Sequence, residues 1–347
     1  MLIVLKYSYT KYPLQFAFDA RTSRGPIQTH VAYLITITDG NKRGIGEASP
    51  LVGLSIDAVP SFEKQLQFFL NELASGKQFT DLDLKMWPAI QFGLETAIAD
   101  FDNGGHQLFE PNDWVHGTPI PINGLVWMQQ ADQMLMQAIT KVQQGYTHIK
   151  FKVGALHFEE ECNLLNEFRK LYSASEVQIR LDANGAFSKN EALEKIQELN
   201  QFHIHSIEQP IPAGNWDAMA ALIQESPIPI ALDEELIGID VWSKGNELMN
   251  HCMPNYLILK PTLIGGIANA NEWIRLAQHY QKGWWATSAL ESSIGLNRIA
   301  QWCSGTGSKI PQGLGTGSLY SNNFESPFTA KAGFLSYDLA KTWKLPF

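Results

Sequence analysis

The 347-residue chain lacks the features that mark several classes of protein. Its three cysteines, Cys162, Cys252 and Cys303, are scattered, form no CxxC pair and predict no disulfide framework. A net charge of -9 without any Lys/Arg run argues against nucleic acid as a partner. Apolar runs such as 2–5 and 227–232 are far shorter than the roughly 20 residues of a membrane span. These absences argue against a disulfide-stapled protein, a nucleic-acid-binding protein and a membrane-spanning protein.

The N-terminal stretch MLIVLKYSYT has no basic region, no long apolar segment and no small-residue cleavage site. We therefore expect no signal peptide, and a reducing cytoplasm is the simplest setting for the unpaired cysteines. The hydrophobic content of 45% suits one large or two ordinary domains with a substantial core.

The first part of the chain mixes strand and helix patterns. The segment YLITITDG (33–40) alternates like a strand and ends in a turn signal. Residues 57–75 and 87–103 show helical periodicity. Gly, Pro and Asn become frequent over 104–123, so we expect an α+β domain over 1–115.

After this boundary, short apolar strands alternate with longer amphipathic helical segments. The expected strands are 121–127, 148–153, 177–182, 205–209, 229–234, 256–261, 284–288 and 313–317. Eight strands separated by helices predict a parallel β/α barrel over 116–318. The rival architecture, an open doubly wound sheet, lacks support because no Gly-rich dinucleotide motif follows the first strand. We expect the segment 319–347 to pack back on the N-terminal domain.

Ionisable residues recur at the ends of five consecutive expected strands. They are Lys152, Asp182, Glu208, Asp233 and Lys260, at intervals of 30, 26, 25 and 27 residues, and Lys150 precedes Lys152 on the same side of its strand. A lone Asp here is usually a helix cap or a turn residue, and a lone Lys usually lies at a sheet edge. Each interval is close to the length of one βα unit. In a β/α barrel, the carboxyl ends of the strands form the active-site mouth. We therefore expect these charges to converge on one site.

Three carboxylates on adjacent strands place three hard oxygen donors around one point. Because no His or Cys accompanies Asp182, Glu208 and Asp233, the expected ion is Mg²⁺, or Mn²⁺, rather than Zn²⁺. Lys152 and Lys260 belong to strands on opposite sides of an eight-stranded barrel. This arrangement suits removal of a proton next to a substrate carboxylate, with the resulting enolate stabilised by the metal ion. We expect a neutral Lys152 to be the base, with Lys150 nearby disfavouring its protonation.

These motifs resemble the enolase superfamily, whose use of a Lys or His base with Mg²⁺ is well known. The resemblance is to its muconate-lactonising branch and rests on KFK (150–152), RLDANGAF (180–187), IEQP (207–210), LDEE (232–235) and LKPTLIGG (259–266). It covers nearly the whole chain and implies a modified TIM-type (β/α)7β barrel. It also implies an N-terminal capping domain, completed by the C-terminal segment, whose loop 46–55 closes over the barrel mouth.

Within this branch the chain looks most like the o-succinylbenzoate synthase family of the menaquinone pathway. Arg180, the motif LKPTLIGG and the stretch SALESSIGL (288–296) carry this resemblance. It implies Mg²⁺-assisted syn β-elimination of water from 2-succinyl-6-hydroxy-2,4-cyclohexadiene-1-carboxylate. Lys152 would remove the α-proton and later assist hydroxide departure, while Lys260 would stay cationic.

The same resemblance implies where the substrate is held. Its contacts would include Arg180, Asn184, Ser288 and Gly315. The succinyl tail would meet loop 22–30, loop 50–55 and the stretch from Ser288 to Ser293. The Gly-rich GLGTGS (313–318) lacks the Lys of a P-loop, so it more simply lets a substrate approach the backbone.

Other functions remain open on the same scaffold. A racemase of N-acylamino acids would use the same two opposed lysines. Dipeptide epimerases of this branch carry Asp-x-Asp on the last strand, where this chain has Gly315-Thr316-Gly317, and a muconate-type cycloisomerase is a weaker alternative. A binding protein that had lost its chemistry should have lost at least one ionisable position, yet all are present. The expected partner is thus a small-molecule carboxylate, and the oligomeric state stays open.

Overall fold

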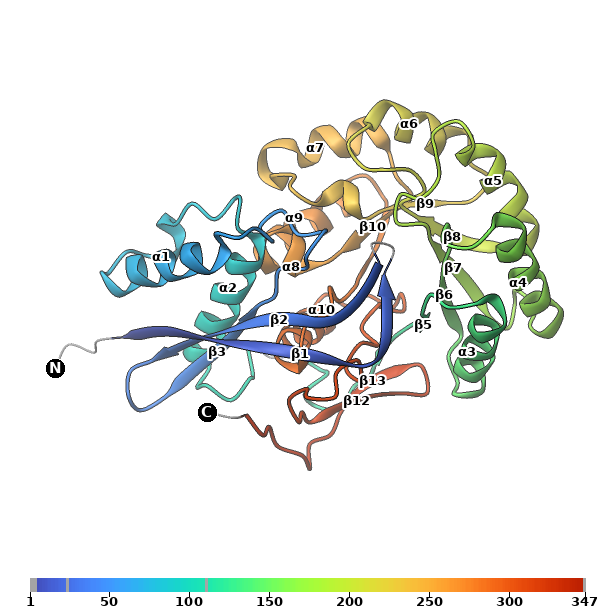
Figure 1. Ribbon diagram of the computed structural model, residues 1–347. Coiled ribbons are helices and arrows are strands. Elements are labelled where there is room, and N and C mark those ends of the chain that lie inside the picture. The colour runs from blue at the N-terminus through green and yellow to red at the C-terminus, as the bar shows by residue number, and fades with distance from the viewer. Residues whose placement is uncertain (1–4, 23–24, 110–111, 346–347) are drawn as a thin grey trace.

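The computed structural model describes residues 5–22, 25–109 and 112–345. In these residues the strands form a three-stranded antiparallel sheet, a seven-stranded parallel sheet and a second three-stranded sheet. Figure 1 shows the parallel sheet curled inside an arc of helices, with a long antiparallel ribbon beside it.

The N-terminal sheet consists of three sequential antiparallel strands with two helices on one face. Its elements are β1 (Lys6–Thr22), β2 (Gly25–Thr38), β3 (Arg43–Ala48), α1 (Phe62–Ala74), the 3-10 turn η1 (Phe79–Asp81) and α2 (Pro88–Asp102). Along β2, Tyr33 and Ile35 pack in one hydrophobic cluster with α1 and α2. The alternate residues Ala32 and Leu34 pack in another cluster with Ile294 and Tyr320. Successive strand residues face opposite sides, so β2 is buried on both faces, and the expected strand and helices are confirmed.

Helix α2 lies directly on the backbone of β3. A Cβ added to Gly46 would come within 2.0 Å of the Gly93 carbonyl oxygen, and one added to Gly44 within 2.3 Å of that of Ala97. Any larger side chain at these positions would push the helix away. The glycines of RGIGEA therefore set how closely the helix approaches strand β3.

Residues 124–286 contribute a parallel sheet ordered β11-β10-β9-β8-β7-β6-β5. Its strands are β5 (Gly124–Val126), β6 (His148–Lys152), β7 (Gln178–Asp182), β8 (Ile204–Glu208), β9 (Ile230–Leu232), β10 (Tyr256–Leu259) and β11 (Gly283–Ala286). The helical elements between and after them are α3 (Ala131–Gln143), α4 (Phe158–Leu171), α5 (Ala192–Leu199), η2 (Asn200–Phe202), α6 (Trp216–Glu225), η3 (Glu234–Leu236), α7 (Val241–Cys252), α8 (Pro261–Ile264), α9 (Gly266–His279) and α10 (Ser293–Gly305). The expected alternation of strand and helix is confirmed, and helices α3 to α7 line the outside of the curl (Figure 1).

The expected eighth strand, 313–317, is wrong as a strand. Isolated parallel bridges join Gln312 to Ile122 and Gly313 to Thr287. The Gln312 side chain also accepts a hydrogen bond from the Ala286 backbone N–H at 2.6 Å. Two bridging residues thus connect the two edges of the seven-stranded sheet, and the fold is a TIM-type barrel of the expected class with a minimal eighth member.

The C-terminal segment contacts both halves of the molecule. The hairpin β12 (Phe328–Lys331) and β13 (Phe334–Tyr337) pairs with β4 (Ile120–Pro121). Upstream of it, Tyr320 bridges Phe16 in the N-terminal sheet, and the Ala17 backbone N–H donates to Leu319. The domain limits at 115/116 and 318/319 stay a prediction.

Two carboxylates of the N-terminal half, the buried Glu47 and the partly buried Glu95, cap barrel helices. Glu47 accepts hydrogen bonds from the backbone N–H groups of Ser292 and Gly295, both at 2.9 Å, at the start of α10. Glu95 accepts from the N–H of Ile267 at 2.6 Å, in the first turn of α9. Negative charge at a helix N-terminus is favourable, so both contacts stabilise docking of the cap on the barrel. No helix in the described part of the chain is long and apolar enough to cross a bilayer.

Candidate active site

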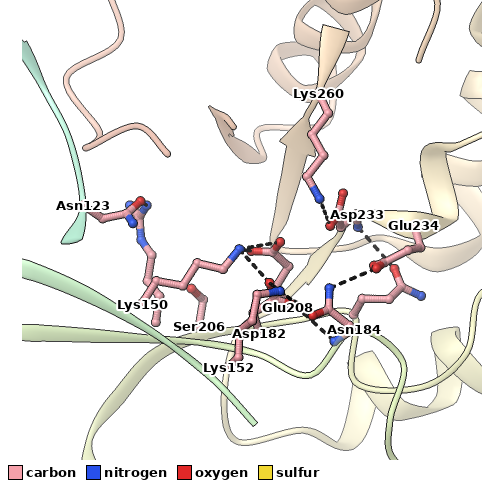
Figure 2. A network of polar contacts seen from close by, with 12 residues as sticks. Asn123, Lys150, Lys152, Asp182, Asn184, Ser206, Glu208, Asp233, Glu234 and Lys260 are labelled. Atoms are coloured by element: carbon pink, nitrogen blue, oxygen red, sulfur yellow. Dashed lines mark hydrogen bonds and ion pairs between the residues drawn. The ribbon is translucent and has the colours of Figure 1, made fainter. Parts of the chain in front are cut away.

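The ends of three adjacent strands bring the predicted ionisable residues together. In the register of the sheet, Lys152 of β6 pairs with Asp182 of β7, which pairs with Glu208 of β8. Paired residues of neighbouring strands point to the same face, so all three side chains enter the barrel mouth. Figure 2 shows the cluster, with Lys260 reaching it from another strand. The order and spacing of the motifs thus do place these side chains at one site.

Lys150 lies between two carboxylates. Its Nζ is 2.8 Å from Asp182 Oδ2 and 2.7 Å from Glu208 Oε2, and the residue is only 5% exposed. Burial by itself disfavours the ammonium, but Asp182, Glu208 and Asp233 outweigh it and raise the pKa of Lys150. Lys150 is consequently a permanent cation that holds two of the carboxylates in place.

Lys260, directly after β10, is paired with Asp233, directly after the neighbouring strand β9. The Lys260 ammonium donates to Asp233 Oδ2, and both residues are buried. Burial raises the pKa of Asp233, Lys260 opposes this effect, and nearby Glu234, Glu208 and Asp182 raise the pKa further, so it lies well above its usual value. Burial is the main cause of this shift, and the single lysine does not fully offset it.

Lys152 is the most exposed of the three lysines in the cluster. Its Nζ donates to Asn184 Oδ1 at 2.6 Å and lies 3.2 Å from Asp182 Oδ2. Asn184 in turn donates through Nδ2 to Glu234 Oε1 at 3.0 Å, and its φ of 44° is in the left-handed region, which Asn tolerates well. A chain of hydrogen bonds from Glu234 through Asn184 thus fixes the direction of the Lys152 amine (Figure 2).

The three carboxylates do not form a ready-made metal cluster. Across the described ranges, no group of three or more His, Cys, Asp or Glu side chains lies close enough to hold an ion. The ammonium group of Lys150 lies between Asp182 and Glu208, and the ammonium group of Lys260 contacts Asp233. The donor chemistry nevertheless suits a divalent cation, because Asp182, Glu208 and Asp233 supply carboxylate oxygens from the ends of three adjacent strands, and hard cations prefer oxygen ligands.

The pocket at this cluster is lined by both polar and apolar residues. Its charged and amide side chains are those of Lys150, Lys152, Asp182, Asn184 and Lys260. Its apolar lining includes Leu51, Leu54, Leu125, Trp127, Ala289 and Leu290. Thr287, Ser288, Gly313, Gly315 and Thr316 complete the lining. The pocket therefore suits a small molecule with a carboxylate at one end and a hydrocarbon body.

The predicted substrate contacts do not all reach this pocket. Ser288 and Gly315 line it, as does Asn184. Arg180 is 1% exposed and lies deeper in the barrel, where its guanidinium is 4.0 Å from the centre of the Trp285 ring and donates to the Pro311 carbonyl at 2.8 Å. Arg180 is not part of the pocket lining, so its role as a substrate contact stays a prediction.

The two predicted cap loops differ in outcome. Leu51 and Leu54 of the loop 50–55 line the pocket, where this loop was expected. The expected loop 22–30 is wrong in its greater part, since β2 already begins at Gly25 and pairs with Thr22. Residues 23 and 24 lie outside the described residues, and none of 25–30 lines the pocket.

Several residues that build the site were missed. Thr287, Thr316 and Trp127 all line the pocket. Glu234 accepts a hydrogen bond from Asn184. Its place directly after Asp233 in the motif LDEE was a signal that could have identified it. Glu291, inside the quoted SALESSIGL, accepts from Ser288 Oγ at 2.5 Å and from the Ala289 backbone N–H at 2.8 Å. Glu291 thus holds the wall that contains Ser288.

Comparison with known families supports this architecture over most of the chain. Residues 133–339 match the model described as enolase C-terminal domain-like, and residues 8–101 match the one described as MenC, N-terminal domain. An o-succinylbenzoate synthase of Desulfotalea psychrophila is 38% identical, with 95% of this chain and 98% of that protein covered.

Solved structures agree with the sequence matches. The crystal structure of MenC from Desulfotalea psychrophila superposes with a TM-score of 0.86 at 36% identity, covering 96% of this chain and 99% of that one. An L-Ala-D/L-Glu epimerase from Bacillus subtilis superposes with a TM-score of 0.82 at 18% identity, over 97% and 96% of the two chains. At that identity the epimerase shows the fold alone.

Proposed function

The chain belongs to the enolase superfamily, and from that premise we propose that it is an o-succinylbenzoate synthase acting in menaquinone biosynthesis. The observation that carries the proposal is the agreement of both halves of the chain with one activity. The barrel supplies the lysines and carboxylates, and the cap matches a domain named for MenC. Its reaction is a lyase reaction, the loss of water from 2-succinyl-6-hydroxy-2,4-cyclohexadiene-1-carboxylate.

Lys152 is the base in this proposal. It lines the pocket, and its Nζ is directed by Asn184 at 2.6 Å and by Asp182 at 3.2 Å. The neutral amine takes the proton alpha to the substrate carboxylate, and the electrons of the broken C–H bond become the enolate. The same ammonium then gives its proton to the departing hydroxyl group, so water leaves and the amine is restored.

Lys260 and Lys150 remain charged throughout. Burial lowers the pKa of Lys260, but Asp233, Glu234 and Glu208 outweigh it, so that the pKa lies above the usual value. A cation held in a buried site stabilises negative charge that develops on the substrate without having to reorganise. Lys260 faces the enolate from the strand opposite Lys152, while Lys150 keeps Asp182 and Glu208 in position.

Members of this superfamily generally use a divalent metal ion. We propose Mg²⁺, with Mn²⁺ as a substitute, held by Asp182, Glu208 and Asp233. When bound, the ion supplies electrostatic stabilisation of the substrate carboxylate as charge builds on it. We also propose that the protein works in the cytoplasm on this free small molecule.

The experiment that tests the function uses the purified full chain with Mg²⁺ and two kinds of substrate. One reaction contains the cyclohexadiene carboxylate, and the other contains a single enantiomer of an N-succinyl amino acid. We expect rapid loss of diene absorbance, negligible racemisation, and loss of activity when EDTA removes the metal. Racemisation without diene turnover would contradict the proposal and favour an N-acylamino acid racemase instead.

A further inference from the structure

One buried side chain outside the ionisable set connects all three carboxylate-bearing strands. Gln209 follows Glu208 directly and is 0% exposed. Its backbone N–H donates to the Ala231 carbonyl of β9 at 2.9 Å, and its own carbonyl accepts from the Gly185 N–H at 2.6 Å, in the loop after β7. Gln209 therefore touches the ends of β7 and β9 while continuing β8.

The side chain of Gln209 extends this connection to the turn that carries Asp233. Its Oε1 accepts from the backbone N–H groups of Asp233 and Glu235, each at 3.2 Å. Its Nε2 donates to the Ile211 carbonyl at 3.0 Å and to Glu235 Oε2 at 3.1 Å. Both ends of the amide are engaged, and no water is needed to satisfy them.

The backbone of Gln209 is held in an unfavourable conformation. Its φ is 40°, in the left-handed region that residues other than Gly, Asn and Asp seldom adopt. Such a conformation persists only where surrounding contacts determine it, and it is common at functional sites. Here it turns the chain immediately after Glu208, so that the amide points at the β9 turn.

We propose that Gln209 is a positioning residue that sets the separation of Asp182, Glu208 and Asp233 for a divalent cation. The inference rests on the proposed function, since it assumes that these carboxylates bind the metal ion. Gln209 does not touch the reacting atoms. It acts by fixing the backbone N–H of Asp233 and the turn after Glu208, so loss of its amide leaves two buried N–H groups without an acceptor and frees the Asp233 turn.

The test measures Mn²⁺ affinity of the full chain without substrate, by electron paramagnetic resonance of the free ion. The variant Gln209→Met keeps the volume of the side chain and removes its hydrogen bonds. We expect its dissociation constant for Mn²⁺ to rise about 10- to 100-fold, the usual effect of losing a residue that orients metal ligands. A constant within about twofold of the unmodified protein would overturn the proposal.

A matched control is Gln312→Met, because Gln312 is another buried glutamine with hydrogen bonds to backbone, among them Ala286 N–H at 2.6 Å, and it contacts none of the carboxylates. Urea unfolding of both variants measures the general cost of removing a buried amide. We expect similar losses of stability in the two but weakened Mn²⁺ binding only at position 209. Equal weakening in both variants would show a merely structural role.

If Gln209→Met does not fold, Gln209→Glu decides the question. A new carboxylate near a cation site would by charge alone strengthen Mn²⁺ binding. Here it would face Glu235 Oε2 and the Ile211 carbonyl, so we expect weaker binding, restored when Glu235→Gln is added. Tighter binding, or no recovery in the double variant, refutes the inference. The Mn²⁺ dissociation constants are measured without substrate. A failure of this proposal can therefore be distinguished from a failure of the proposed diene turnover.

Discussion

The two ends of the barrel interior are built from the same strands and differ in almost every chemical property. Ala231, Ile258 and Trp285 form a hydrophobic cluster deep in the barrel. Asp233 lies two residues after Ala231, and Lys260 lies two residues after Ile258. Both belong to the charged cluster. Side chains two residues apart on a strand point to the same side. Only the position along the strand therefore decides whether a side chain packs in the core or enters the charged cluster.

The difference teaches where stability and activity are located. Deep in the barrel, Tyr256 lies against Trp285 with ring centres 5.2 Å apart, and His205 stacks on Tyr256 at 5.3 Å. These rings fill the deep end of the barrel and pack against one another there. At the mouth, Lys150 and its partners are buried ion pairs, which apolar residues of similar volume can often replace without loss of stability. We therefore expect these charges to be kept for function rather than for stability.

Arg180 marks the boundary between these two ends. Its guanidinium covers the Trp285 ring at 4.0 Å, while Asp182 stands two residues further along β7. Burial lowers the pKa of Arg180 to about 10, partly opposed by Glu208 and Tyr256. Arg180 therefore packs like a member of the deep cluster, while its charge interacts with that of Glu208 at the mouth.

The largest effect is expected at the mouth, from Lys152→Ala. We expect kcat/KM for the diene to fall about 10²- to 10⁴-fold, because the group that takes the proton is lost. Lys152→Arg is the matched control, since it keeps the cation but cannot serve as a base at neutral pH. Both variants should fold normally by circular dichroism. Activity within tenfold of the original in Lys152→Arg would show that charge alone suffices.

At the deep end, Trp285→Ala should instead reduce stability. Trp285 is 1% exposed, and removal of a buried Trp costs about 3–5 kcal/mol of the free energy of unfolding. Urea unfolding measures this, with Trp242→Ala as control because Trp242 is 65% exposed and should change stability little. Similar losses in the two variants would mean that the deep cluster is not part of the core.

The deep end should also make stability depend on pH. Burial lowers the pKa of both His148 and His205 to about 4, with Arg180 contributing. Their folded pKa values lie below the unfolded value near 6.5, so their contribution to stability is complete above 6.5 and is lost as the pH falls toward 4. Unfolding at several pH values measures the slope.

His205→Phe is the variant that isolates this effect. Phe keeps a ring against Tyr256 but cannot be protonated, so the loss of stability between pH 6.5 and 4 should become smaller than in the unmodified protein. An unchanged slope would assign the pH dependence to other groups, such as the carboxylates.

The smallest effect is expected at the pocket wall, from Ser288→Ala. The Ser288 hydroxyl donates to Glu291 and lines the pocket, so its loss removes one hydrogen bond of about 1 kcal/mol. We expect kcat/KM to fall roughly fivefold, mainly through KM. Ser243→Ala, on an exposed turn of α7, serves as control. A hundredfold loss of kcat would instead give Ser288 a part in the chemistry.

The sequence alone determined the alternation of strand and helix and the residues that converge at the barrel mouth. Lys152, Asp182 and Glu208 could be placed because each ends a short strand and parallel strands end at the same edge, and Lys150 because it lies two residues before Lys152 on the same side. Local periodicity and spacing carry that information, and the cap helices were found in the same way.

Only the tertiary structure decided which partners these residues have. Lys150 pairs with two carboxylates, Lys152 is held by Asn184, and Gln209 joins three strand ends. The eighth strand shrinks to two bridging residues, and Arg180 turns to Trp285 rather than to the pocket. These contacts join residues far apart in the chain and depend on turns with positive φ, which spacing along a sequence does not encode.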